Sequence, residues 1–279
     1  MMWLLLAALS SMCSVGQSAF TKTASTKGKT AVSMGFNALK VGASLAFFLL
    51  ISFYNIQIHI PTVLYASVYG FALFFSTLFG YMALMHGSMA LTSLIVSYSV
   101  IIPCFYGIFF LGETVGVIRI LGIALLLVSM YLLKHQAENV KLSNKWFIYV
   151  AVTFLCNGLC SVIQKLHQIT YPSSYCKEFM IYSLCVTFIL FLVISIYKKE
   201  EKNTGVMRYA VIAGILMGLG NYLTLVLSSR VDATVLFPLV SIFSMLFNVL
   251  VSKLYFKDKF SIMQLIGIGL GVFSVLLIK

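Results

Sequence analysis

The stretch WLLLAALSSMCSVGQSAFTK at residues 3–22 returns in related form at residues 146–165, as WFIYVAVTFLCNGLCSVIQK. Both stretches are apolar and have the length of about 20 residues that an α-helix needs to cross a bilayer. The identical positions, at a shift of 143 residues, are Trp3 and Trp146, Ala8 and Ala151, Cys13 and Cys156, Ser18 and Ser161, and Lys22 and Lys165. This recurrence predicts that the chain contains two copies of one unit.

The likeness extends beyond these two stretches. At the same shift and without a gap, Phe36 falls on Phe179 and Phe48 on Phe191. We therefore expect a first repeat at 1–134, a connecting loop at 135–145 and a second repeat at 146–279. If each copy crosses the membrane five times, the second copy must insert upside down relative to the first, as in many secondary transporters.

The composition places the chain in a membrane. Hydrophobic residues make up 61% of it and charged residues 9%, against roughly 25% charged in a soluble domain. The predicted fold is therefore all-α, with ten transmembrane helices arranged as two inverted five-helix repeats. The ten expected spans are 2–21, 35–54, 62–85, 89–111, 115–134, 146–166, 178–197, 206–228, 232–254 and 261–279.

The net charge of +12 has a membrane explanation. Most basic residues fall in the loops that follow spans one, five, seven and nine, and basic loops favour the cytoplasmic side. The lysine count thus predicts that both termini face away from the cytoplasm. Nucleic acid is not expected as a partner, because this charge lies in short loops at helix ends.

Polar side chains recur at helical spacing within two of the spans. Such a stripe should face protein or water, because positions that face lipid are apolar. One interpretation is hydrogen bonding between helices, worth about 0.6 kcal/mol per contact in membranes, and the other is the lining of a cavity. The stripe of span one is Ser10, Ser14, Gln17 and Thr21, and the stripe of span six is Thr153, Asn157, Cys160 and Gln164.

Other spans add hydroxyl, amide and aromatic groups with little formal charge. Such a lining suits a small organic solute better than a metal ion, which would call for carboxylates. Two lysines at matching span ends could either reach the headgroups or attract an anionic substrate group. The candidate substrate-binding residues are Ser14, Gln17, Lys22, Ser97, Tyr98, Asn157, Ser161, Gln164, Lys165, Asn221, Tyr222, Ser241, Ser244 and Asn248.

The sequence indicates no metal site, cofactor or catalytic centre. The six cysteines form no C-x-x-C pair, and such a pair would be expected of a zinc or redox motif. The histidines at 59, 86, 135 and 167 are scattered near predicted span ends. We therefore expect no enzymatic activity, since a membrane-embedded enzyme would need clustered His, Asp, Glu or Cys.

One patch carries a family resemblance. Pro103, then Gly112-Glu113-Thr114, then Gly122-Ile123 resembles the signature of the drug/metabolite transporter superfamily, in its ten-helix EamA type. The second copy is similar in a weaker form, with Asp258 in the place of Glu113. The resemblance implies a cavity lined chiefly by spans one, three, four, six, eight and nine. It also implies cytoplasmic termini, against the lysine count, and a structural turn at Glu113.

These observations favour a secondary transporter that exports a small polar or amphipathic metabolite, amino acid or drug by alternating access. A flippase for a lipid-linked sugar is the alternative within transport, and a membrane-embedded enzyme or a non-transporting scaffold are the alternatives outside it. We expect a multi-pass protein of the plasma or inner membrane. Its partners would be a small-molecule substrate, the lipid bilayer and, in a homodimer, a second copy.

Overall fold

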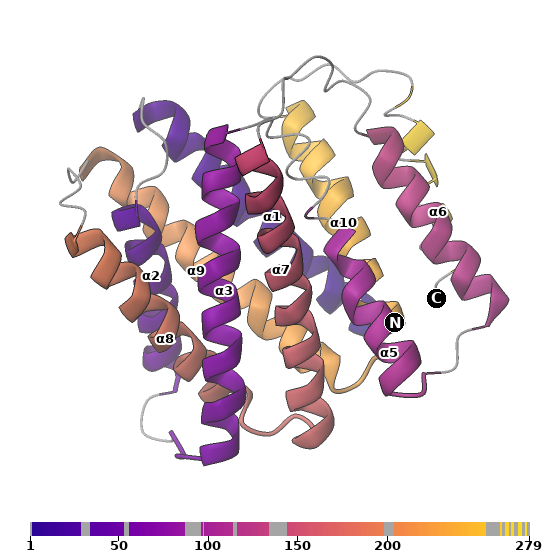
Figure 1. The fold of residues 1–279 in the computed structure, drawn as a ribbon, viewed down its shortest axis with the longest axis horizontal. Helices are drawn as coiled ribbons and strands as arrows, with labels where there is room; N and C mark the ends of the chain where they lie inside the picture. The colour runs from indigo at the N-terminus through magenta and orange to yellow at the C-terminus, as the bar shows by residue number, and fades with distance from the viewer. Residues whose placement is uncertain are drawn as a thin grey trace. The chain divides into compact units, whose positions relative to one another are not determined.

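A computed structural model describes most of the chain. The described residues are 2–28, 34–52, 56–86, 96, 98–113, 116–133, 144–197, 204–254, 263, 266–267, 269–270, 273–274 and 277. Within these residues the structure is helical and contains no strand. The helices of Figure 1 are α1 (Met2–Gly28), α2 (Met34–Ile51), α3 (Ile60–His86), η1 (Tyr98–Val100), α5 (Ile101–Phe110), α6 (Val117–Leu133), α7 (Asn144–Thr170), α8 (Cys176–Tyr197), α9 (Thr204–Ser228) and α10 (Ala233–Leu254).

These helices match most of the expected spans to within a few residues at most ends. Six of the described helices are long and apolar enough to cross a bilayer, namely α1, α2, α3, α7, α8 and α9. Shorter apolar helices cover Tyr98–Phe110, Ile120–Ser129 and Ala233–Ser244. Many large apolar side chains on these helices are exposed, among them Leu5, Leu155 and Ile196. Such exposure indicates a protein whose solvent is lipid.

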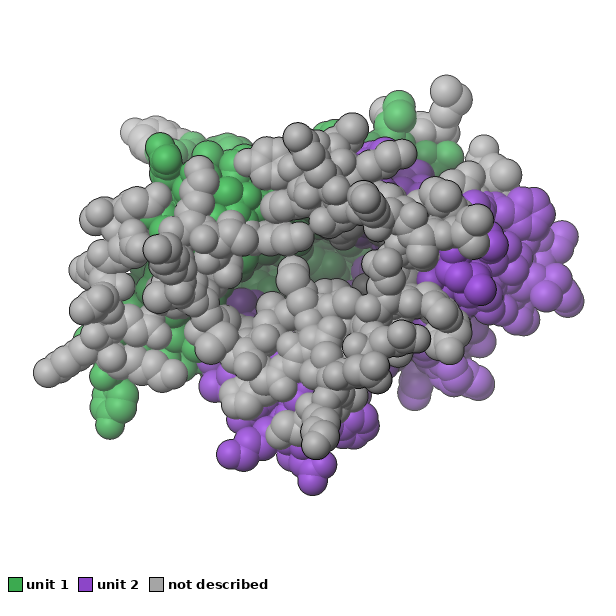
Figure 2. Space-filling model, turned by 90° about the horizontal axis from the view of Figure 1, so that it is seen from above, with its two compact units in different colours: residues 1–74, 163–230 green, residues 75–162, 231–279 purple. Residues whose placement is uncertain are grey.

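The chain forms two compact units, coloured separately in Figure 2. Unit 1 contains residues 1–74 and 163–230, and unit 2 contains residues 75–162 and 231–279. Each unit therefore draws helices from both predicted repeats. Helices α3 and α7 each contribute residues to both units.

In unit 1, α9 packs against both α1 and α2, and α2 also packs against α8. Ser10 near the start of α1 donates a hydrogen bond to the Gly220 carbonyl near the end of α9. Phe20 near the end of α1 lies beside Tyr209 near the start of α9, with ring centroids 6.4 Å apart. Helices α1 and α9 are thus antiparallel.

Glycines allow α9 to approach α2 closely. A Cβ atom at Gly214 would meet the Lys40 carbonyl, and one at Gly218 would meet Ser44 Oγ. One turn further on, the rings of Phe48 and Tyr222 lie 5.7 Å apart. The contacts advance in the same direction along both helices, so α2 and α9 are parallel. Small residues four apart permit such close packing.

In unit 2, α10 contacts η1, α5 and α6. The Ser129 hydroxyl of α6 donates a hydrogen bond of 2.6 Å to the Gly267 carbonyl. Trp146 and Val150 of α7 form a buried cluster with Ala83 of α3. This cluster ties the end of α3 to the start of α7.

The two prolines inside the predicted spans, Pro103 and Pro238, occupy different positions in their helices. Pro103 occupies the first turn of α5, directly after the 3₁₀ turn η1, where a missing N–H leaves no helical bond unmade. Pro238 lies inside α10 and removes the donor that would bond to the Thr234 carbonyl. The first turns of α10 are thereby weakened, and this end of the helix needs support from elsewhere.

Candidate functional site

The polar stripe of α1 lies opposite its exposed apolar side. Leu5, Leu9 and Met12 are 68%, 47% and 54% exposed. Each residue advances about 100° around a helix, so Ser14 points about half a turn away from Leu5. The stripe residues Ser10, Ser14, Gln17 and Thr21 are buried or half-buried. The polar side of α1 therefore faces protein, and the apolar side is left for lipid.

Helix α7 also has an exposed apolar side and a polar side opposite to it. Its exposed apolar side carries Ile148, Leu155 and Leu159. Asn157 follows Leu155 by about 200°, which places it on the opposite side of the helix. Asn157 is nevertheless exposed. A side chain that is exposed on the side away from the apolar residues borders a space open to water or to a solute.

Part of the α1 stripe serves to hold two helices together. Ser10 Oγ lies 2.7 Å from Thr224 Oγ1 and is fully buried. Ser14 donates to the Ser10 carbonyl at 3.1 Å, and a Cβ at Gly220 would lie 3.2 Å from the Ser14 hydroxyl. Gln17 is half-buried, and its side chain has no hydrogen-bond partner among the described residues. Gln17 is thus the member of this stripe that is available to a ligand.

The α7 stripe ends in a buried polar contact within unit 1. Gln164 Nε2 donates to the Tyr69 hydroxyl at 3.2 Å, and the Gln164 carbonyl accepts a hydrogen bond from Ser228 at 3.4 Å. Both Gln164 and its neighbour Lys165 are buried, at 4% and 7% exposure. The contact joins α3, α7 and α9.

In unit 2 the Asn157 amide donates to Ser99 Oγ at 2.7 Å. The Tyr98 hydroxyl donates to the Leu127 carbonyl at 3.2 Å, so Tyr98 holds η1 to α6. Ser161 is half-buried and lies 3.5 Å from the Asn157 carbonyl. The structure therefore places Asn157 and Ser161 on neighbouring turns of α7, with Ser99 as the partner of Asn157.

The remaining candidates lie on α9 and α10. Tyr222 is on the side of α9 that meets Phe48 of α2. Asn221, Ser241 and Ser244 are half-buried, and their side chains have no hydrogen-bond partner among the described residues. The side chains of Lys22 and Asn248, and the whole of Ser97, lie outside the described residues.

The hydrogen bonds of Glu113 give it a structural role at the start of α10. Its carboxylate accepts hydrogen bonds from the Ala233 N–H at 2.8 Å, the Thr234 N–H at 3.0 Å and the Thr234 hydroxyl at 2.9 Å. These groups form the start of α10, where a negative charge is stabilised by the helix dipole. Gly112 reaches the required turn with φ of 64°. A Cβ at Gly107 would lie 2.6 Å from Glu113 Oε2.

The structure brings together two histidines that the sequence analysis described as scattered. His59 Nδ1 lies 2.9 Å from Thr62 Oγ1, and His167 Nε2 lies 3.1 Å from the same oxygen. The two histidines are 108 positions apart in the sequence, and no motif links them, so spacing could not have paired them. Among the described residues no group of three or more His, Cys, Asp or Glu could hold a metal ion.

The second half of the chain matches a known protein family. Residues 144–279 match the model of the EamA-like transporter family. This family is part of the drug/metabolite transporter superfamily. The match indicates a membrane transporter of the drug/metabolite type, and such a transporter implies a small-molecule substrate and membrane lipid as partners. The match begins two residues before the predicted second repeat.

The fold is also known from a solved structure. A protein crystal structure is similar over 99% of this chain and 97% of its own, with a TM-score of 0.77 and 17% sequence identity. At this identity the similarity shows the fold alone. No curated protein sequence matches the chain.

Proposed function

We propose that this protein is a secondary transporter that exports a small polar or amphipathic metabolite, amino acid or drug by alternating access. The observation that carries the proposal is the two-sidedness of α1 and α7. Each has an exposed apolar side and, about half a turn away, a polar stripe. On α7 this polar side includes the exposed Asn157. Substrate contact at the polar side would explain why an amide is accessible there.

Helix directions in unit 1 support an inverted repeat. Within one copy the first and third helices run the same way, because successive spans alternate. Helix α9 is the third helix of the second copy, and it runs antiparallel to α1 and parallel to α2. Both directions are those expected if the second copy inserts upside down, and opposite to those expected if it does not.

Matched contacts support the same proposal. The Thr187 hydroxyl of α8 donates to the Gly70 carbonyl of α3 at 3.0 Å. Its counterpart at a shift of 143 residues, Ser44 of α2, lies at Gly218 of α9. Four residues beyond each glycine, aromatic rings meet in the same way. These pairs are Phe74 with Phe191 at 4.8 Å, and Tyr222 with Phe48 at 5.7 Å.

The chemistry of the candidate groups favours an uncharged or weakly charged organic substrate. Gln17 and Asn221 offer amides on α1 and α9, and Asn157 offers one on α7. Amides both donate and accept hydrogen bonds, so they suit hydroxyl, amino and carboxyl groups. We further propose location in the plasma or inner membrane. A homodimer, the orientation of the termini and a role for the candidates on η1 and α10 stay predictions.

A flippase for a lipid-linked sugar is the second candidate function. It would also need a polar compartment, but its substrate would have to enter from the bilayer. Reconstitution separates the two, because a flippase moves a lipid between leaflets and the proposed transporter moves a soluble solute between compartments.

A ligand screen on purified protein tests the proposal. Ligands that bind the native state raise its melting temperature, so a library of polar metabolites should contain compounds that stabilise the wild type. Asn157→Leu and Gln17→Leu should lose this stabilisation and the flux of the same compound in proteoliposomes. Thr170→Val is the matched control, because Thr170 is exposed and bonds only to the Leu166 carbonyl of its own helix. Unchanged binding and flux in both leucine variants would refute the proposed site.

A further inference from the structure

A chain of hydrogen bonds in unit 1 joins the half-buried His59 to the exposed turn after α7 through three buried side chains. It begins at His59, which precedes α3, and passes through Thr62 to His167 of α7. It continues from His167 Nδ1 to Gln168 Nε2 at 2.9 Å, and Gln168 Oε1 accepts the Ser173 N–H at 3.0 Å. Thr62, His167 and Gln168 are fully buried. All five residues belong to unit 1.

One backbone group fixes the direction of every bond in this chain. The Ser173 N–H can only donate, so Gln168 must present its oxygen there and its NH₂ group to His167. His167 Nδ1 therefore accepts a hydrogen bond and carries no proton. The neutral ring then holds its proton on Nε2 and donates to Thr62 Oγ1. The Thr62 hydroxyl proton is left to point at His59 Nδ1.

We propose that His167, which the hydrogen-bonded path from His59 through Thr62 holds with its proton on Nε2, is a proton-binding site whose occupancy is sensed by Gln168 and by the turn that joins α7 to α8. The proton comes from water, binds the Nδ1 lone pair and leaves the ring with one positive charge. Two donors, this N–H and the Gln168 NH₂ group, would then face each other. Rotation of the Gln168 amide by half a turn removes the clash, and it turns an NH₂ group toward Ser173.

The turn at residues 171–175 is the element that responds to protonation of His167. Ser173 and Tyr175 have φ values of 56° and 51°, a left-handed conformation that non-glycine residues adopt only when their surroundings hold them there. The hydrogen bond from Ser173 to Gln168 is one such constraint. Its loss on protonation frees the connection between α7 and α8. The inference that this site couples helix movement to proton binding rests on the proposed transport function.

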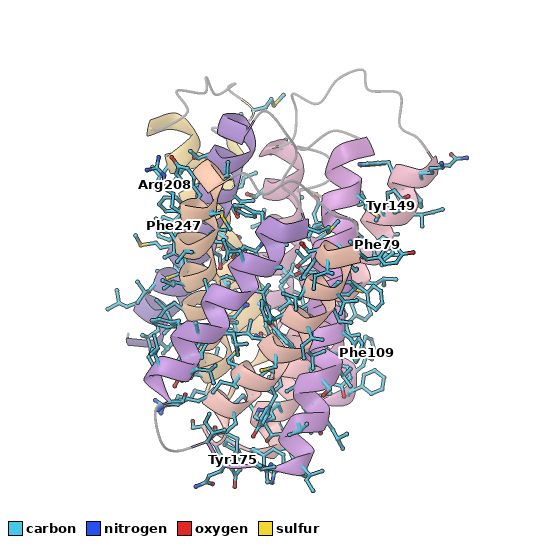
Figure 3. All side chains as sticks on the ribbon, turned by 90° about the vertical axis from the view of Figure 1, so that its left-hand side faces the viewer. Phe79, Phe109, Tyr149, Tyr175, Arg208 and Phe247 are labelled. Carbon is cyan, nitrogen blue, oxygen red and sulfur yellow. The ribbon has the colours of Figure 1, made fainter. Side chains whose placement is uncertain are left out.

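Aromatic rings hold the two histidines of the path in place. The His59 ring is stacked on Tyr175 with centroids 4.3 Å apart, and it meets the edge of Tyr171 at 4.8 Å. Figure 3 labels Tyr175 at this end of the helices. The His167 ring lies 4.6 Å from the ring of Phe179. This packing leaves His59 half-buried and His167 fully buried. Because Nε2 of His167 already carries a proton, the new proton reaches Nδ1 from the side of Gln168 and the turn.

Other titratable groups lie around the path. Lys165 is on the opposite side of α7 from His167, because two residues advance about 200°. Cys176 of α8 contacts the Gln168 side chain, and Glu178 lies near that cysteine. The groups that face the path from each packed element are Tyr65 of α3, Tyr171 and Tyr175 of the turn, and Cys176 and Glu178 of α8.

Nitrogen NMR of histidine-labelled protein in nanodiscs tests the site without any substrate. At neutral pH, His167 should show an unprotonated Nδ1 and a protonated Nε2. As the pH is lowered from about 8 to about 4, across the range in which histidines titrate, Nδ1 should gain a proton. The protection factor of the Ser173 amide, which is the intrinsic exchange rate at each pH divided by the observed rate, should fall at least about tenfold over the same range, which corresponds to about 1.4 kcal/mol.

The Gln168→Glu variant gives the sharpest comparison. A carboxylate has two acceptor oxygens, so it can hold the Ser173 N–H and a protonated His167 together. This variant should carry a protonated His167 at neutral pH and keep Ser173 protected at every pH. Ser67→Ala on α3 is the control, because Ser67 bonds only to the Val63 carbonyl. It should behave like the wild type.

Three results would overturn the proposal. They are a protonated Nδ1 on wild-type His167 at neutral pH, a Ser173 protection factor that does not change with pH, and a Gln168→Glu variant with a neutral His167. If that variant does not fold, the two wild-type measurements still decide. A failed transport assay beside the expected proton signals would count against the proposed function and leave the proton site standing.

Discussion

Replacing Glu113 tests whether the Gly-Glu-Thr patch stabilises the start of α10. Its carboxylate accepts three hydrogen bonds at the start of α10, and these oppose the weakening caused by Pro238. In Glu113→Gln one oxygen becomes an NH₂ group that faces a backbone N–H donor in either amide orientation, so at least one of the three bonds and the charge are lost. Bonds to charged groups contribute about 1.5–3 kcal/mol each and are not additive, so we expect a loss of about 2–4 kcal/mol of unfolding free energy.

Equilibrium unfolding of the purified protein in mixed detergent measures this loss. Asp232→Asn is the matched control, because Asp232 is an exposed carboxylate at the same helix end, and its removal should cost no more than about 1 kcal/mol. Glu113→Asp should recover part of the stability, since it restores the charge on a shorter side chain. Equal stability of Glu113→Gln and Asp232→Asn would refute the assigned role of Glu113.

Three further substitutions test the helix contacts by the same unfolding measurement. Gly214→Ala should destabilise by about 1–3 kcal/mol through overpacking against α2, whereas Gly269→Ala, with nothing within 4 Å of its added Cβ, should be neutral. Ser10→Ala should cost up to about 1.7 kcal/mol, and Ser18→Ala, whose hydroxyl bonds only within α1, should cost less. Tyr69→Phe should cost about 1–3 kcal/mol, because it leaves the buried amide of α7 without its acceptor. Equal effects within either matched pair, or a neutral Tyr69→Phe, would contradict the contacts described above.

The parts of the fold that depend on composition and spacing were predictable from the sequence. Apolar runs of spanning length placed the long helices, and the turn at Tyr171 was marked by Pro172 and two serines. The polar stripe of α1 followed from spacing alone, since residues three and four apart share one side of a helix. The family was also predictable, because Pro103, Glu113 and their glycines form a local motif.

Partners that are distant in the sequence were not predictable. Gln164 bonds to Tyr69 across 95 positions, and Asn157 bonds to Ser99 across 58. Hydrophobic periodicity shows which side of a helix is polar, but it does not show which helix lies opposite. For the same reason the sequence analysis described the histidines as scattered, although Thr62 connects His59 to His167.

Thiol labelling along α7 tests most directly whether the polar stripe borders water inside the protein. Single cysteines are introduced by Asn157→Cys and Leu155→Cys in a chain whose six native cysteines have been replaced. A water-soluble, membrane-impermeant thiol reagent should react with Asn157→Cys, and a ligand from the screen should protect it. Leu155→Cys should react only with a lipid-soluble reagent. Reaction of the soluble reagent at position 155 and not at 157 would contradict the account.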